Sequence, residues 1–238
     1  MAAVTVYGPP LSTAVARVLA CLFEKEVSFQ LAAVDMAKGQ HKSPDFLKLQ
    51  GLVWQAGGIS AEITAPPDRH RVSCVRLISA EISDESRAIS RYICDKYADQ
   101  GYKALFGNSI LERARIDQWL EAESQNFNPP SSVLVFQLAF APRMGLKQDP
   151  EAIKENVGKL AKVVDVYERR LEESRFLAGD EFSLADLTHL PNGQFLANAA
   201  ESAHLFTTGT NVARWWGEIS SRPSWKKVIE AQLAPVPS

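Results

Sequence analysis

Residues 176–191 have the sequence FLAGDEFSLADLTHLP, and this stretch says more about the fold than any other part of the chain. Within it, Asp186 follows Ser183 at the spacing of a capping box. In such a box the serine hydroxyl accepts a hydrogen bond from the downstream amide while the carboxylate accepts one from the serine amide. The pattern predicts that a helix begins just after Ser183. We therefore assign Asp186 a structural role rather than a catalytic one.

The residues on either side of this box predict a mainly helical second half. Apolar side chains recur at helical spacing over residues 151–174. A helix predicted over residues 111–125 should end before Pro129 and Pro130, because proline cannot continue a helix from its interior. A helix from Glu85 should end near residue 99, where a linker to residue 108 begins. Further helices are predicted at residues 133–146, 212–221 and 225–233.

The first residues follow a different pattern. Residues 4–8 are β-like and are stopped by Gly8-Pro9-Pro10, and residues 27–33 alternate apolar and polar side chains. Between them, residues 14–25 have helical spacing, and either Ser12 or Thr13 could cap the helix. Strand, helix and strand in so short a length predict a βαβ unit.

The composition is that of an ordinary globular protein and excludes some functions. Of the 238 residues, 46% are apolar and 23% charged, and the formal charge of −2 gives no reason to expect nucleic-acid or anionic-membrane binding. The three cysteines have no metal-binding spacing, and Cys21 and Cys94 stand among apolar residues, which favours buried, reduced thiols. With no apolar run long enough to span a bilayer, we expect a cytoplasmic protein.

Two further runs carry a resemblance to a known family. They are HKSPDF at residues 41–46 and ESRAISRYI at residues 85–93. Together with residues 108–227 and the capping-box stretch, they resemble the plant phi class of glutathione transferases. The resemblance implies a thioredoxin-like α/β domain at residues 1–98, an all-helical domain at residues 109–238, and a homodimer. It also implies conjugation of glutathione to hydrophobic electrophiles, as in detoxification, with glutathione as co-substrate and no metal.

The resemblance assigns roles to particular residues. Ser12 matches the family's catalytic serine, and a hydroxyl at a helix N-terminus could stabilise the glutathione thiolate, with Thr13 as its neighbouring competitor. His41 and Lys42 match the residues that bind the glycine carboxylate of glutathione. Glu85 and Ser86 match those that bind its γ-glutamyl end. An electrophile pocket would lie near Leu11, Trp119 and Phe127, although these aromatic residues are equally compatible with a plain core.

Residues 51–84 do not follow the family pattern. The family has here a shorter strand hairpin that follows a cis-proline, and its backbone pairs with the middle of glutathione. The only prolines in this segment are Pro66 and Pro67, and Pro67 stands too far before Glu85 for the family register. We therefore expect weak transferase activity. The alternatives are a non-catalytic, ligandin-like binder and the inactive product of an altered gene model.

Overall fold

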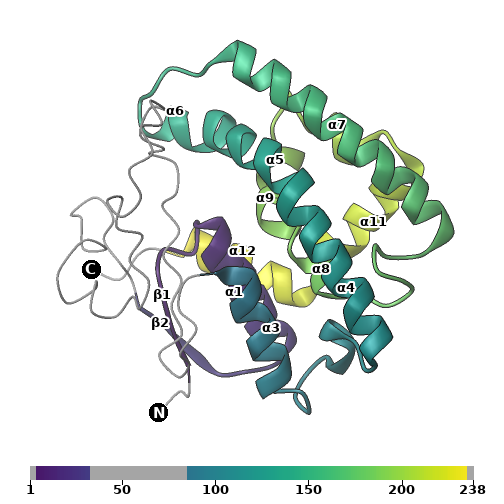
Figure 1. The fold of residues 1–238 in the computed structure, drawn as a ribbon. Coiled ribbons are helices and arrows are strands. Elements are labelled where there is room, and N and C mark those ends of the chain that lie inside the picture. Colours follow the sequence, from purple (N-terminus) through teal and green to yellow (C-terminus); the bar gives the residue numbers. More distant parts are fainter. Residues whose placement is uncertain (1–3, 33–84, 235–238) are drawn as a thin grey trace, which may run out of the picture.

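The computed structural model describes residues 4–32 and 85–234 (Figure 1). The strands are β1 (Val4–Tyr7) and β2 (Phe29–Ala32). The α-helices are α1 (Thr13–Glu24), α3 (Ser86–Lys96), α4 (Ile110–Ala122), α5 (Asn128–Val135), α6 (Ala141–Arg143), α7 (Pro150–Glu173), α8 (Leu184–Leu187), α9 (Leu190–Ala197), α10 (His204–Thr207), α11 (Thr210–Ser220) and α12 (Pro223–Leu233). Between them lie the 3₁₀ segment η2 (Lys103–Phe106) and the π-helical segments η3 (Glu123–Phe127) and η4 (Phe136–Phe140).

The βαβ unit predicted at the N-terminus is confirmed. Strands β1 and β2 pair in parallel, with Val4 opposite Phe29 and Tyr7 opposite Ala32, and α1 connects them. Ser12 is the N-cap of α1, and Thr13 is the first helical residue. The helix is buried on nearly all sides, since it packs against α3, α12, α8 and α9 as well as lying beside the sheet.

Helices α1 and α3 run side by side in the same direction. Arg17 contacts Ser86, and Cys21, one turn further along α1, contacts Ser90 and Cys94 on α3. Because the contacting residue numbers increase together along both helices, the two helices are parallel. The N-termini of α1 and α3 therefore lie at the same end of the pair, which brings Ser12 and Glu85 to one face.

The helix predicted to end before Pro129 and Pro130 instead continues through them, so that prediction is wrong. Backbone angles stay helical from α4 through η3 into α5, and the amide of Asn128 donates to the carbonyl of Glu123, five residues earlier. A π-helical turn shifts the hydrogen-bond register by one residue. The prolines then fall in the first turn of α5, where a missing amide hydrogen costs little.

The capping box at Ser183 is confirmed, and it is part of a larger buried cluster. The Asp186 carboxylate accepts hydrogen bonds from the amide and hydroxyl of Ser183, at 3.0 and 3.2 Å. It also accepts from the amide of Leu177 at 3.0 Å and the indole of Trp215 at 2.9 Å. One side chain thus joins the start of α8 to the preceding loop and to α11.

Next to this cluster, His189 is fully buried and neutral. Its Nδ1 lies 2.8 Å from the carbonyl of Ala185, to which it donates, so Nε2 accepts from the Tyr167 hydroxyl at 2.9 Å. Burial lowers the pKa of His189 to about 4 and raises the pKa of Asp186 to about 6. In both cases burial disfavours the charged form.

These two shifts have opposite effects on stability as the pH falls. Below pH 6.5, the unfolded chain binds a proton at His189 that the folded chain does not bind until about pH 4, so acid favours unfolding. The Asp186 carboxyl binds its proton near pH 6 in the folded chain but only near pH 3.8 in the unfolded chain. Between these pH values acid therefore favours folding. The two contributions largely cancel between pH 6 and 4.

Replacing His189 with asparagine should expose the Asp186 contribution alone. The amide can still donate to Ala185 but does not titrate. Relative to the unchanged protein, the free energy of unfolding of His189→Asn should rise by up to about 1.4 kcal/mol for each pH unit lowered from 6 to 4.5. Urea titrations at several pH values measure this difference. Parallel curves for the two proteins would contradict a neutral buried histidine.

Candidate active site

Ser12 lies at the N-terminus of α1 and is only 8% exposed. Its Oγ accepts from the amide of Val15 at 3.5 Å, a long capping bond. The hydroxyl hydrogen is not used by this contact and can be donated to a second group. A hydroxyl donor together with the positive end of a helix is suited to an anion such as a thiolate.

Glu85 and Ser86 form the N-terminus of α3. Glu85 is the N-cap, and its carboxylate accepts from the amide of Arg87 at 3.1 Å. Ser86 is buried, and its hydroxyl accepts from a guanidinium nitrogen of Arg17 at 2.6 Å. Since Arg17 lies five residues beyond Ser12 and contacts Ser86, a rise of roughly 1.5 Å per residue offsets the ends of α1 and α3 along the helix axis by only about one and a half turns. The structure thus brings these three predicted residues to neighbouring helix ends.

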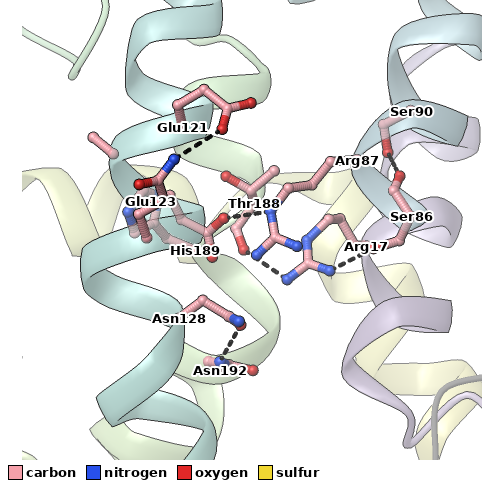
Figure 2. A network of polar contacts seen from close by, with 12 residues as sticks. Arg17, Ser86, Arg87, Ser90, Glu121, Glu123, Asn128, Thr188, His189 and Asn192 are labelled. Atoms are coloured by element: carbon pink, nitrogen blue, oxygen red, sulfur yellow. Dashed lines mark hydrogen bonds and ion pairs between the residues drawn. The ribbon is translucent and has the colours of Figure 1, made fainter. Parts of the chain in front are cut away.

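Two arginines and a glutamate lie directly beneath these helix ends. No role was predicted for them from the sequence. Figure 2 shows the guanidinium groups of Arg17 and Arg87 next to each other, between α1 and α3 on one side and the α4–η3 segment on the other. Arg87 pairs with the fully buried Glu123 at 2.7 Å and with Glu85 at 3.2 Å. Arg17 also donates to the carbonyl of Thr188 at 3.5 Å.

The sequence does hold a signal for one of them. Arg17 interrupts an otherwise apolar run in a helix that is buried all round, and a charge in that position needs a polar partner. Arg87 lies inside the ESRAISRYI run, but its partner Glu123 is 36 residues away, in the π-helical turn that the sequence did not predict. Pattern reasoning could have found Arg17 but not the pair.

The cluster holds charges of both signs. Burial, and then the neighbouring Arg87, lower the pKa of Arg17 to about 10, so it remains a cation at neutral pH. Partial burial alone would raise the pKa of the Glu85 carboxyl, but the amide and guanidinium of Arg87 outweigh it and hold that pKa below its usual value. Two guanidinium groups thus face one buried and one largely exposed carboxylate.

Several polar atoms of the cluster also lack a partner among the described residues. They are Nε of Arg17, one terminal nitrogen of Arg87, and Oε1 of Glu123, all buried. Unpaired buried polar atoms cost free energy, and native structures have few of them. The cluster is therefore a polar site with unused hydrogen-bonding capacity next to the start of α3.

The remaining predicted residues have different outcomes. His41 and Lys42 lie outside the described residues. Phe127 is fully buried in the core, where its ring lies 4.6 Å from that of His189, and Trp119 packs edge-on against Tyr167, so these aromatics serve the core. Leu11 is 40% exposed beside Ser12. Across residues 4–32 and 85–234, no cluster of histidine, cysteine and acidic side chains could hold a metal ion, and no helix could cross a membrane.

Comparison with known proteins agrees with this geometry. Residues 2–56 match the model of the glutathione S-transferase N-terminal domain, and residues 127–223 match that of the C-terminal domain. The chain is 39% identical to glutathione S-transferase F10 of Arabidopsis thaliana, over 98% of this chain and 99% of that protein.

Solved structures give the same result. Glutathione transferase F2 of Populus trichocarpa is 57% identical, with a TM-score of 0.84 over 96% of this chain and 98% of that one. A maize glutathione S-transferase I, in complex with an atrazine–glutathione conjugate, is 27% identical, with a TM-score of 0.80 over 99% of this chain and all of that one. The chain therefore belongs to the phi class of plant glutathione S-transferases and is a transferase enzyme of that family.

Proposed function

We propose that the chain conjugates the thiolate of glutathione to small hydrophobic electrophiles, with Ser12 as the catalytic residue. The observation that carries this proposal is the meeting of two helix N-termini at one face. One end presents the Ser12 hydroxyl, and the other presents Glu85 and Ser86 above the guanidinium groups of Arg17 and Arg87. Glutathione has a thiol at its middle and a charged γ-glutamyl group at one end, which matches this arrangement.

Ser12 would act on the thiol. The unperturbed pKa of a thiol is near 8.5, and thiols at helix N-termini have values of about 3.5–7.5. The Ser12 hydroxyl would donate its free hydrogen to the sulfur while the end of α1 adds positive potential, so that more of the bound glutathione is thiolate at neutral pH. The thiolate then attacks an electrophilic carbon, and the leaving group departs or the added electron pair is protonated by water.

The two ends of glutathione would be held by charge. Glu85 pairs with the γ-glutamyl ammonium, and its lowered pKa keeps it ionised to do so. The α-carboxylate binds at the start of α3, where Ser86 and the helix end are backed by Arg17. By resemblance to the family, His41 and Lys42 bind the glycine carboxylate at the opposite end.

The electrophile would be hydrophobic. The maize transferase is in complex with a conjugate of glutathione and atrazine. Next to Ser12, the exposed Leu11 gives this side of the site an apolar surface. By the same family resemblance, we propose a cytoplasmic homodimer that takes part in detoxification.

A second candidate function is a glutathione-independent binder. The N-terminal family match ends at residue 56, within the atypical segment 51–84, while the C-terminal match is unbroken over residues 127–223. If the segment does not rebuild the family hairpin, two backbone hydrogen bonds to glutathione are lost. At about 0.5–1.5 kcal/mol each, this loss would weaken binding by roughly 5- to 150-fold.

A chimera tests both proposals. Replacing residues 51–84 with a family-type hairpin of about 16 residues should strengthen glutathione binding by roughly 5- to 150-fold, measured as retention on immobilised glutathione. Turnover should rise as well. The matched control carries the same hairpin together with Ser86→Ala, which should weaken retention again. Strong retention and turnover in the unchanged chain would show that its own segment builds a working site. No retention by either protein would favour the binder.

A further inference from the structure

Two cysteines away from the helix ends lie against each other. The Sγ atoms of Cys21 on α1 and Cys94 on α3 are 3.8 Å apart, although the residues are 73 positions apart in the chain. Both thiols are free and buried. Neither is needed for the glutathione site proposed above, because Ser12 and Ser86 lie about two turns or more away along the same helices.

Only one of the two sulfurs belongs to a residue that can be reached from solvent. Cys94, which is 5% exposed, lines a cavity of about 220 Å³, whereas Cys21 is fully buried and does not line it. The wall of this cavity includes the exposed residues Lys103 and Asn108, so it connects with solvent. Its volume is several times the roughly 30 Å³ that a water molecule occupies in the liquid, which leaves room for a small hydroperoxide.

Charged side chains of both signs line the cavity. Lys103 and Arg113 are the two cations on its wall. Arg113 forms an ion pair with Asp95 at 2.9 Å, and Asp99 is also on the wall. Cys21 donates its single hydrogen to the carbonyl of Ser90, so the Cys94 thiol is the donor in the contact between the two sulfurs.

We propose that Cys94 is a hydroperoxide-sensitive thiol and that Cys21 is its resolving partner, so that oxidation joins α1 to α3. In the first step the Cys94 thiol gives its proton to water, and its sulfur attacks the outer oxygen of a hydroperoxide. The O–O bond breaks, a sulfenic acid remains, and the departing alkoxide, or hydroxide from hydrogen peroxide, takes up a proton and leaves as an alcohol or as water. In the second step the Cys21 sulfur attacks the sulfenic sulfur. The hydroxyl leaves with the Cys21 proton as water, and a disulfide remains.

The geometry favours this order of events. Burial, followed by the contact with Cys94, raises the pKa of Cys21, which keeps this thiol protonated and slow to react with peroxide by itself. Once Cys94 is oxidised, the nearest nucleophile is already 3.8 Å away. A disulfide needs about 2.05 Å between the sulfurs, so the two side chains must move to bring the sulfurs from 3.8 Å to that distance. Cys21 must also give up its weak contact with the carbonyl of Ser90 at 3.6 Å.

Peptide mapping after mild peroxide treatment tests the proposal. Cys74 is first replaced with alanine so that it cannot compete. The folded Cys74→Ala protein, treated with hydrogen peroxide and digested without reductant, should yield a linked peptide that contains Cys21 and Cys94 and disappears with dithiothreitol. Native alkylation should label Cys94 at least about tenfold faster than Cys21, since Cys94 lines the 220 Å³ cavity and Cys21 does not.

Two variants separate the roles of the cysteines. Adding Cys21→Ala should trap the Cys94 sulfenic acid, which dimedone then labels. Adding Cys94→Ala should leave Cys21 unlabelled. Circular dichroism shows whether each variant is folded, and if either is not, the alkylation order in the Cys74→Ala protein decides. Equal labelling of both cysteines, or oxidation of Cys94 to sulfinic acid without a linked peptide, would overturn the proposal.

Discussion

Ser12→Ala should lower kcat for a standard aromatic electrophile by about 100-fold or more. The substitution removes the hydroxyl donor that would stabilise the thiolate in the transition state. It should leave α1 in place, because the capping bond from the Val15 amide is long, at 3.5 Å, and the helix is held by burial on several sides. Steady-state kinetics and circular dichroism on the same preparation measure the two effects separately.

Thr13→Ala is the matched control for this experiment. Thr13 is the next residue, carries the same functional group, and is the first residue of α1 rather than its cap. We expect it to change kcat by much less than Ser12→Ala. If the two substitutions caused equal and small losses, the positive end of α1 would account for the effect and Ser12 would not be the catalytic residue.

The parts of the fold that could be predicted from sequence are those fixed by local patterns. Residues 183–186 predicted a helix start because a capping box needs only a serine and a carboxylate at fixed spacing. Alternating and helical periodicities at the N-terminus predicted the parallel pairing of β1 and β2 around α1. In each case one short segment holds all the information.

The parts that could not be predicted depend on distant residues. The rule that proline ends a helix failed at Pro129 because a π-helical turn shifted the register just before it. That same turn contains Glu123, which forms the buried ion pair with Arg87. The sequence suggested Ser12, Glu85 and Ser86 through resemblance and held a signal for Arg17, yet gave no sign that Arg17 and Arg87 lie together beneath them.

Asp186→Ala should destabilise the helical part of the protein more than the loss of an ordinary cap. Asp186 is fully buried and accepts hydrogen bonds from Ser183, Leu177 and Trp215. Removing a cap costs about 1–2 kcal/mol, and leaving a buried donor unpaired costs about 1–3 kcal/mol. Since the amide of Leu177 and the indole of Trp215 would both lose their acceptor, we expect a total loss of at least about 3 kcal/mol at pH 7, where the carboxylate is ionised.

Ser109→Ala gives the matched comparison. Ser109 caps α4 by accepting from the amide of Glu112 at 3.2 Å, but it is exposed and holds no second element. Its removal should cost only about 1 kcal/mol. Urea unfolding of both variants measures the difference, and the KM for glutathione should be unchanged in each. A loss at Asp186 no greater than that at Ser109 would mean that its links to the loop and to α11 add nothing, and a changed KM at unchanged stability would point to a role in the site.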